Sequence, residues 1–195
     1  MRRQALPLLP IQGIFHGTLI ACEDGNVPVQ AVRAGDIVNT LSDGPQVVRW
    51  VGRSLASTAV QFESSAFGPN TPDNPLLVGP AQRMVLSGWQ PKVLFGESEV
   101  LVGAEALVNG ENICLITLSE EVESYHILFD NHEIISANGA KSESFHPSKT
   151  GLSALAPASL TTLRANMPNL GGLNRPFSLV RPAISAAEAA LLRGG

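Results

Sequence analysis

The chain has 195 residues, of which 44% are hydrophobic and 15% charged, which is enough apolar material to bury a core and excludes wholesale disorder. The net charge of −4 gives no electrostatic case for nucleic acid, although residues 1–144 hold 16 acids and 8 Lys/Arg while residues 145–195 hold one acid and 5 Lys/Arg. With 18 glycines and 14 prolines, the sequence favours a turn-rich β protein over a helical bundle.

The N-terminal residues make a poor secretory signal, because Pro7 and Pro10 interrupt a short apolar run and no small-residue cleavage site follows. No stretch approaches the ~18 apolar residues of a membrane span. Two cysteines, Cys22 and Cys114, cannot build a disulfide framework or supply a four-ligand zinc site without histidines. These features slightly favour the cytoplasm, and they predict no cofactor and no metal.

Short strand-like runs separated by turn signals fill the first third of the chain. Asp24-Gly25 and Asp43-Gly44 are turn dipeptides, and the runs between them are rich in β-branched residues. The predicted strands cover residues 18–22, 27–32, 37–41 and 46–51. This spacing of about ten residues is typical of a β sandwich or barrel. Three prolines and a glycine then predict a loop over residues 64–75.

Strand-like runs resume after this loop. The predicted strands cover residues 76–78, 83–86, 93–95, 99–102, 112–118, 124–129 and 133–137. Residues 104–108 predict one helical turn, which Asn109-Gly110 closes. About ten short strands therefore fit residues 17–145, which predicts an all-β domain.

From Pro147 the composition changes to Ser, Pro, Asn and Gly with scattered apolar residues. We expect a tail in which residues 147–175 are mobile. Ser185 and Glu188 form a capping box, which predicts one short helix near residues 186–193. So short a helix persists only when it docks, here through Ala189, Leu191 and Leu192.

An ordered set of motifs resembles the hedgehog/intein (Hint) domain family, and its bacterial branch in particular. The motifs are Gly17-Thr18-Leu19-Ile20, Asp24-Gly25, Ala34-Gly35-Asp36-Ile37-Val38, Arg49-Trp50-Val51-Gly52, Val78 to Met84, Tyr125 to Gly139, and Ser142 to Pro147. The resemblance implies a Hint-like fold with pseudo-twofold β subdomains over residues 13–147, after an N-terminal extension (1–12) and before a tail (148–195).

Hint proteins attack their own backbone, and the resemblance implies where the reacting groups would lie. A Cys, Ser or Thr four residues before the Gly-Thr pair is the nucleophile, and that position is Gly13. The Thr/Ser-x-x-His that holds the amide and protonates the leaving amine becomes Gly79 to Gln82, and Gln82 cannot deliver a proton. The terminal His-Asn would fall at Glu143 and Ser144. The resemblance therefore implies a degenerate autoprocessing site.

Some polar residues of the late motif remain, namely His126, Asp130, His132 and Asn138. His126 is interpreted as a half-buried structural residue, and Asp130 and Asn138 as turn residues. His132 is the residual candidate for a base. Cys22, nine residues past Gly13, could be a relocated nucleophile acting with His132 if its thiol pKa were lowered. A zinc site from Cys22, Cys114, His126 and His132 has suitable atoms but lacks the usual ligand spacing.

Three functions remain open. The first is a Hint domain without self-cleavage that persists as a stable binding or scaffold module, with a protein as a possible partner. The second is a self-cleaving domain that uses Cys22, and the third is an unrelated β binding domain. Related bacterial domains often lie in exported proteins, so the resemblance also allows export.

Overall fold

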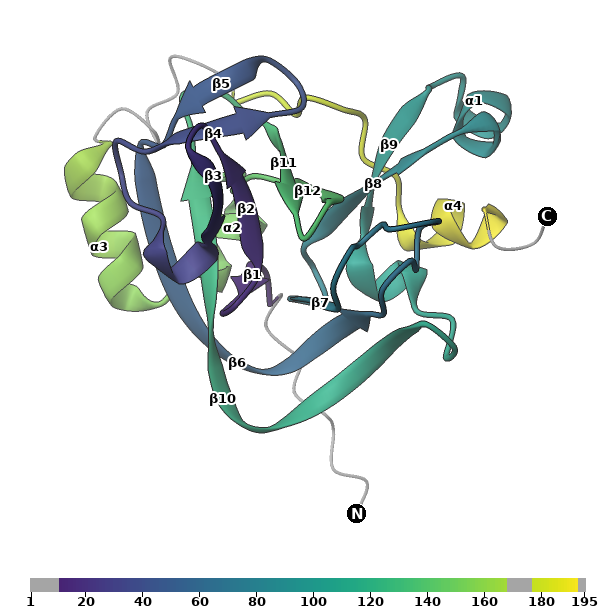
Figure 1. Cartoon of the computed structure of the whole chain (residues 1–195), viewed down its shortest axis with the longest axis horizontal. Coiled ribbons are helices and arrows are strands. Elements are labelled where there is room, and N and C mark those ends of the chain that lie inside the picture. Colours follow the sequence, from purple (N-terminus) through teal and green to yellow (C-terminus); the bar gives the residue numbers. More distant parts are fainter. Residues whose placement is uncertain (1–10, 168–176, 193–195) are drawn as a thin grey trace.

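The computed structural model describes residues 11–167 and 177–192, which form a mostly β fold with several short helices (Figure 1). The strands are β1 (Ile14–Phe15), β2 (Leu19–Cys22), β3 (Gly25–Pro28), β4 (Ile37–Thr40), β5 (Gly44–Val47), β6 (Trp50–Phe62), β7 (Leu76–Val78), β8 (Arg83–Ser87), β9 (Glu99–Gly103), β10 (Ile113–Leu128), β11 (Ile134–Ala137) and β12 (Ala140–Glu143). The α-helices are α1 (Trp89–Phe95), α2 (Lys149–Ala154), α3 (Pro157–Asn166) and α4 (Ala186–Leu191), and 3₁₀ turns cover Val29–Ala31 and Ala104–Leu107.

Two long strands, β6 and β10, pair antiparallel and curve along one side of the molecule (Figure 1). They pair from Trp50 opposite Leu128 to Phe62 opposite Ile113, with a register shift between Thr117 and Val122. With β1 and β7 they close a barrel, and the remaining strands form a second sheet in the order β5-β4-β2-β11-β12-β8-β9, with β3 beside β2. The two predicted strands over 112–118 and 124–129 are therefore one bent strand.

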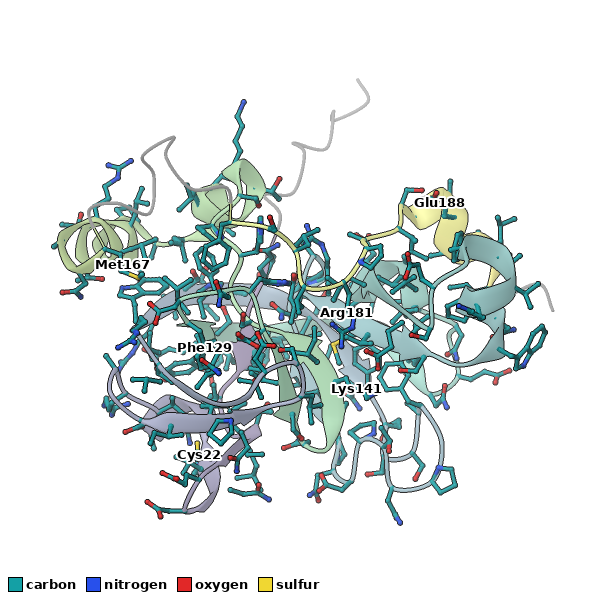
Figure 2. All side chains as sticks on the ribbon, turned by 90° about the horizontal axis from the view of Figure 1, so that it is seen from above. Cys22, Phe129, Lys141, Met167, Arg181 and Glu188 are labelled. Atoms are coloured by element: carbon teal, nitrogen blue, oxygen red, sulfur yellow. The ribbon has the colours of Figure 1, made fainter. Side chains whose placement is uncertain are left out.

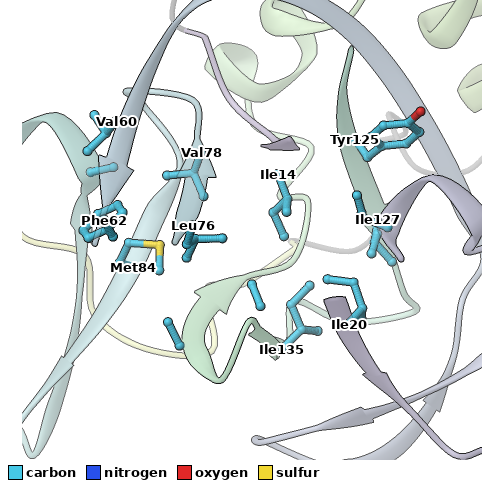
Figure 3. Close-up of a cluster of buried hydrophobic side chains, with 14 of the residues drawn as sticks. Ile14, Ile20, Val60, Phe62, Leu76, Val78, Met84, Tyr125, Ile127 and Ile135 are labelled. Carbon is cyan, nitrogen blue, oxygen red and sulfur yellow. The ribbon is translucent and has the colours of Figure 1, made fainter. Parts of the chain in front are cut away.

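The principal core lies between these sheets and includes the start of the described chain (Figure 3). Ile14 is 2% exposed and lies between Val78 on β7 and Tyr125 on β10. Burying a side chain of this size stabilises the fold by about 1.5–3 kcal/mol. The segment before Ile14 is therefore held at a fixed place against β7 and β10.

The predicted strand over 93–95 is wrong, because these residues end helix α1. Gly88 lies before the helix with φ +131°, and Gly96 ends it with φ +75°, both in the region that favours glycine. The hydrophobic run therefore forms a short helix between β8 and β9. The helical turn predicted at 104–108 is confirmed as a 3₁₀ turn over Ala104–Leu107.

The prediction of a tail with a single short helix is also wrong. Ser148 caps α2 by accepting the amide of Gly151, and Pro157 begins α3. Leu163 on α3 is 2% exposed in a second hydrophobic cluster, with Trp50 and Phe145. Residues 147–167 are thus packed rather than mobile, because these anchors share one cluster; the rest of that predicted segment, 168–175, lies outside the described residues.

The capped helix predicted near the C-terminus is present as α4. Ser185 and Glu188 form the expected capping box, and Ala189 and Leu192 are buried. Gln90 of α1 donates to the carbonyl of Leu192 at 3.3 Å. Leu191, expected at the docking face, is exposed instead. Among the described helices, none has the length and apolar character needed to cross a membrane.

Candidate functional site

The peptide bond between Gln12 and Gly13 is buried where the chain enters the barrel. Both residues are buried, and the amide of Ala81 donates to Ile11 O at 2.8 Å while the amide of Gly79 donates to Gly13 O at 2.9 Å. Gln12 also reaches Ala81 O through its side chain at 3.4 Å. The aligned nucleophile position and the aligned Ser/Thr-x-x-His segment therefore lie against each other.

Gln82 joins this peptide to the end of β12. Its Oε1 accepts the amide of Gly13 at 3.0 Å, and its Nε2 donates to Ser142 Oγ at 3.0 Å and to Glu143 O at 2.8 Å. All three bonds are buried. The carboxamide therefore holds the nitrogen that a general acid would have to protonate, but the amide of Gln82 has no acidic proton to give.

His126, rather than His132, lies beside position 13. A Cβ built on Gly13 would lie 3.0 Å from His126 Cε1, and Gly13 has φ +105°. Ser54 Oγ donates to Ala154 O at 3.0 Å, so His126 Nε2 donates to Ser54 Oγ at 3.1 Å. Burial lowers the pKa of His126 to about 4, which keeps its ring neutral near pH 7.

His132 has partners on both ring nitrogens. Its Nδ1 accepts the amide of Val180 at 3.1 Å, so its Nε2 donates to Glu143 Oε2 at 3.1 Å. The guanidinium of Arg83 binds the same carboxylate oxygen at 3.1 Å. His132 therefore contacts Glu143, whose carbonyl accepts from Gln82, and it binds the backbone of the C-terminal segment at Val180.

The other candidates lie away from the Gln12–Gly13 peptide. Asp130 forms an exposed ion pair with Arg49, with the two charged atoms 2.7 Å apart. Asn138, with φ +47°, accepts the amide of Leu19 at 2.8 Å and donates to Pro75 O at 3.0 Å, so it fixes a hairpin turn.

The surroundings of Cys22 disfavour the thiolate form of its side chain. Burial, followed by the nearby Asp36 and Asp24 carboxylates, raises the pKa of its thiol. Figure 2 shows Cys22 at the opposite side of the molecule from Glu188 on α4. Within residues 11–167 and 177–192, no three His, Cys, Asp or Glu side chains gather as metal ligands, so the four-residue zinc possibility fails.

Sequence reasoning missed Ser124. Its buried hydroxyl donates to Gln12 O at 3.3 Å, so both ends of the Gln12–Gly13 peptide are hydrogen-bonded. Nothing in the local sequence distinguishes Ser124 from any other strand serine. Its importance follows only from the pairing of β1 with β10, which places Phe15 opposite Ser124.

Glu133 is a fully buried carboxyl whose charge costs stability. Its Oε2 accepts from Ser42 and Thr40, while its Oε1 has no partner. Burial raises the pKa of Glu133 above 4.5, against the smaller effect of the Ser42 hydrogen bond. A raised folded-state pKa gives stability that is present below pH 4.5 and is lost as the pH rises through the folded value.

We therefore expect Glu133→Gln to become more stable relative to the wild type as the pH rises from about 4 to 7, by about 1.4 kcal/mol for each unit by which the folded-state pKa of Glu133 is raised. Urea unfolding of both proteins at several pH values measures this. Parallel stability curves would show that Glu133 carries no charge penalty.

The comparisons with known proteins found one family model and several structures of similar fold. The Hint domain model matches residues 13–149, well over half of the chain. No curated protein matches the sequence. The bacterial intein-like domain from Clostridium thermocellum has 12% identity and a TM-score of 0.52, and the match covers 68% of this chain and 97% of that one.

A splice-inactive variant of the AceL NrdHF class 3 split intein is also similar, with 12% identity and a TM-score of 0.50 over 67% of this chain and 95% of that one. At such identities these neighbours support the fold alone. The family match begins at Gly13 and covers both sheets and the end of β12. The chain therefore belongs to the Hint domain family.

Proposed function

We propose that this Hint domain does not cleave its own chain and acts as a stable binding or scaffold module. The observation that carries the proposal is Gln82, whose Oε1 accepts the amide of Gly13 at 3.0 Å. A residue in that place would have to protonate the leaving nitrogen, and a carboxamide cannot. Gly13 has no side chain with which to begin an acyl shift.

The remaining candidates, Cys22, His126 and His132, do not supply the missing nucleophile and proton donor. Both ring nitrogens of His132 are engaged, and the pKa of the Cys22 thiol is raised, which lowers its thiolate fraction. His126 is beside position 13, but its Nε2 donates to Ser54 Oγ, whose own proton goes to Ala154 O. These contacts favour an inactive site over one with a relocated nucleophile.

We also propose that residues 13–147 are the Hint unit, with pseudo-twofold β subdomains, and that the following segment is part of the folded molecule. Trp50 Nε1 donates to Thr162 Oγ1 at 3.1 Å, and Ser159 bonds the backbone of Arg53. Such contacts between α3 and β6 support a tail that covers the β domain.

Intact mass spectrometry tests the proposal. The purified chain should keep its mass of 20.6 kDa after prolonged incubation with and without a thiol. Thiol is the appropriate challenge, because it intercepts the thioester that a Hint nucleophile would form. A fragment beginning at residue 13 would show that the domain cleaves itself at the aligned position, and one beginning at Cys22 would support the relocated nucleophile.

A further inference from the structure

We propose that the outer edge of β9 and the side chains beside it form a peptide-binding surface, which residues 177–184 of the same chain occupy as an intramolecular ligand. The inference rests on the proposed function, because it gives the binding module its site. It also names the partner: a protein that presents an extended peptide with an arginine between apolar residues. The residues of this peptide surface are Glu99, Leu101, His132, Ile134 and His146.

The occupying segment pairs with β9 through its backbone. Figure 1 shows this segment, in yellow, passing β9 before it enters α4, and in the described part of the chain β9 ends the strand order of the second sheet. Leu101 N donates to Pro182 O at 2.8 Å, and Ile184 N donates to Leu101 O at 3.0 Å. Ala183 lies opposite Leu101 in a parallel bridge. An extended peptide binds a sheet edge in this way, with main-chain bonds supplying the affinity.

Two histidines extend the backbone contacts beyond β9. His132 Nδ1 accepts the amide of Val180 at 3.1 Å, and His146 Nε2 donates to Phe177 O at 2.7 Å. The two rings pack edge to face, with centroids 5.2 Å apart. Because these bonds reach main-chain atoms, they fit an extended peptide in this register whatever its side chains.

Glu99 selects an arginine in the ligand. Its Oε2 accepts Arg181 Nε at 2.8 Å and its Oε1 accepts Lys141 Nζ at 2.6 Å; Figure 2 labels both cations. These hydrogen bonds, that of Lys141 first, lower the pKa of Glu99 to about 2, so its carboxylate is charged near pH 7. A charged carboxylate binds a guanidinium strongly and repels an acidic residue in the same place.

Apolar side chains on both sides of Arg181 complete the recognition. Leu179 and Val180 pack on the small cluster that contains Leu101. Ile184 packs on the principal core. Every residue from 177 to 184 is nevertheless at least partly exposed, whereas Leu101 beneath them is buried. The segment therefore lies on the folded domain as a bound peptide does, instead of forming part of its core.

Attachment makes residues 177–184 a strong competitor of a partner peptide. A tethered ligand acts at an effective concentration of about millimolar, which a free peptide must exceed. We therefore expect a free peptide to bind the wild type weakly. It should bind a chain whose own segment is loosened at least about tenfold more tightly.

The full chain carrying Val180→Pro/Ile184→Pro tests the proposal, with Ala183→Pro as the matched control. The double variant removes the amides that bond His132 and Leu101, so Leu101 N should exchange at least about tenfold faster. A synthetic peptide of residues 177–184 should bind it and restore the protection. Ala183→Pro should leave Leu101 protected, because successive amides of an extended segment face opposite sides. Unchanged exchange in the folded double variant, or no protection by the peptide, would overturn the proposal.

Arg181→Glu keeps the proposal falsifiable if the double variant does not fold. It retains every backbone amide but places a second carboxylate beside Glu99, so Leu101 should again exchange faster and the peptide should again protect it. The same peptide with Arg181→Glu should bind at least about tenfold more weakly, by fluorescence anisotropy. Equal binding of the two peptides would overturn the ligand class. A dimer of the loosened chain that excludes the peptide would assign the surface to a second copy and overturn the separate partner.

Intact mass recorded on the same samples separates this inference from the proposed function. A fragment starting at residue 13 contradicts the absence of cleavage. A full-length, folded chain that binds no peptide contradicts the peptide surface alone.

Discussion

The double variant Gly13→Cys/Gln82→His should cleave before residue 13 in the presence of thiol about 10²–10⁴-fold faster than Gly13→Cys alone. That factor is the usual contribution of general acid catalysis. Position 82 lies where the acid is needed, because its side chain already contacts Gly13 N at 3.0 Å. Without a proton donor, a thiol at position 13 forms a thioester slowly, because the unprotonated nitrogen of residue 13 is a poor leaving group.

The reaction is measured as the rate at which the fragments accumulate in the mass spectrum. Gly13→Ala/Gln82→His is the matched control, because it carries the same histidine and a Cβ at position 13 but no thiol; it should stay intact. Circular dichroism must show equal folded fractions, since a Cβ at 13 is crowded. If the double variant is no faster than Gly13→Cys, Gln82 does not occupy the acid position.

The second large effect concerns the packing of α3 on the β domain. Leu163→Ala should lower the free energy of unfolding by about 2–5 kcal/mol, because it removes a 2% exposed side chain from the cluster with Trp50 and Phe145. For a chain of this size each kcal/mol lowers the melting temperature by about 2–4 °C.

Calorimetry and limited trypsin digestion measure this effect together. Thr161→Ala on the exposed side of α3 is the control and should change stability by no more than about 0.5 kcal/mol. Cleavage after Arg164 should accelerate in Leu163→Ala only. A melting temperature equal to that of the wild type would mean that α3 adds nothing to the stability of the domain.

Much of the β structure was predictable because local turn motifs mark its hairpins. Asp24-Gly25 and Asp43-Gly44 mark hairpins that the structure confirms, and the Ser185–Glu188 capping box correctly placed α4. The tail helices were missed because a Ser-, Pro- and Asn-rich composition resembles a loop. Their stability depends on tertiary contacts such as Leu163 with Trp50, which no local pattern reveals.

The candidate site was also predictable only in part. The motif spacing predicted that positions 13 and 82 correspond to the reacting groups, and the structure brings Gly13 and Gln82 into contact. It separates His132 from them and places His126 nearer instead. The hydrogen bonds from Gly79 to Gly13 and from Ala81 to Ile11 could not be predicted, because they depend on how residues 11–13 lie against the turn between β7 and β8, far along the chain.

The backbone amide of Gly13 offers the most direct test of the account. Its resonance in a ¹⁵N-labelled full chain exists as a peptide amide only if the Gln12–Gly13 bond is intact, and it exchanges slowly only if Gln82 accepts its hydrogen bond. We predict one Gly13 amide signal, protected like the amides of the β6–β10 pair, that persists through incubation with thiol. Loss of that signal with the appearance of a free amino group at residue 13, or exchange as fast as in an unfolded chain, would contradict it.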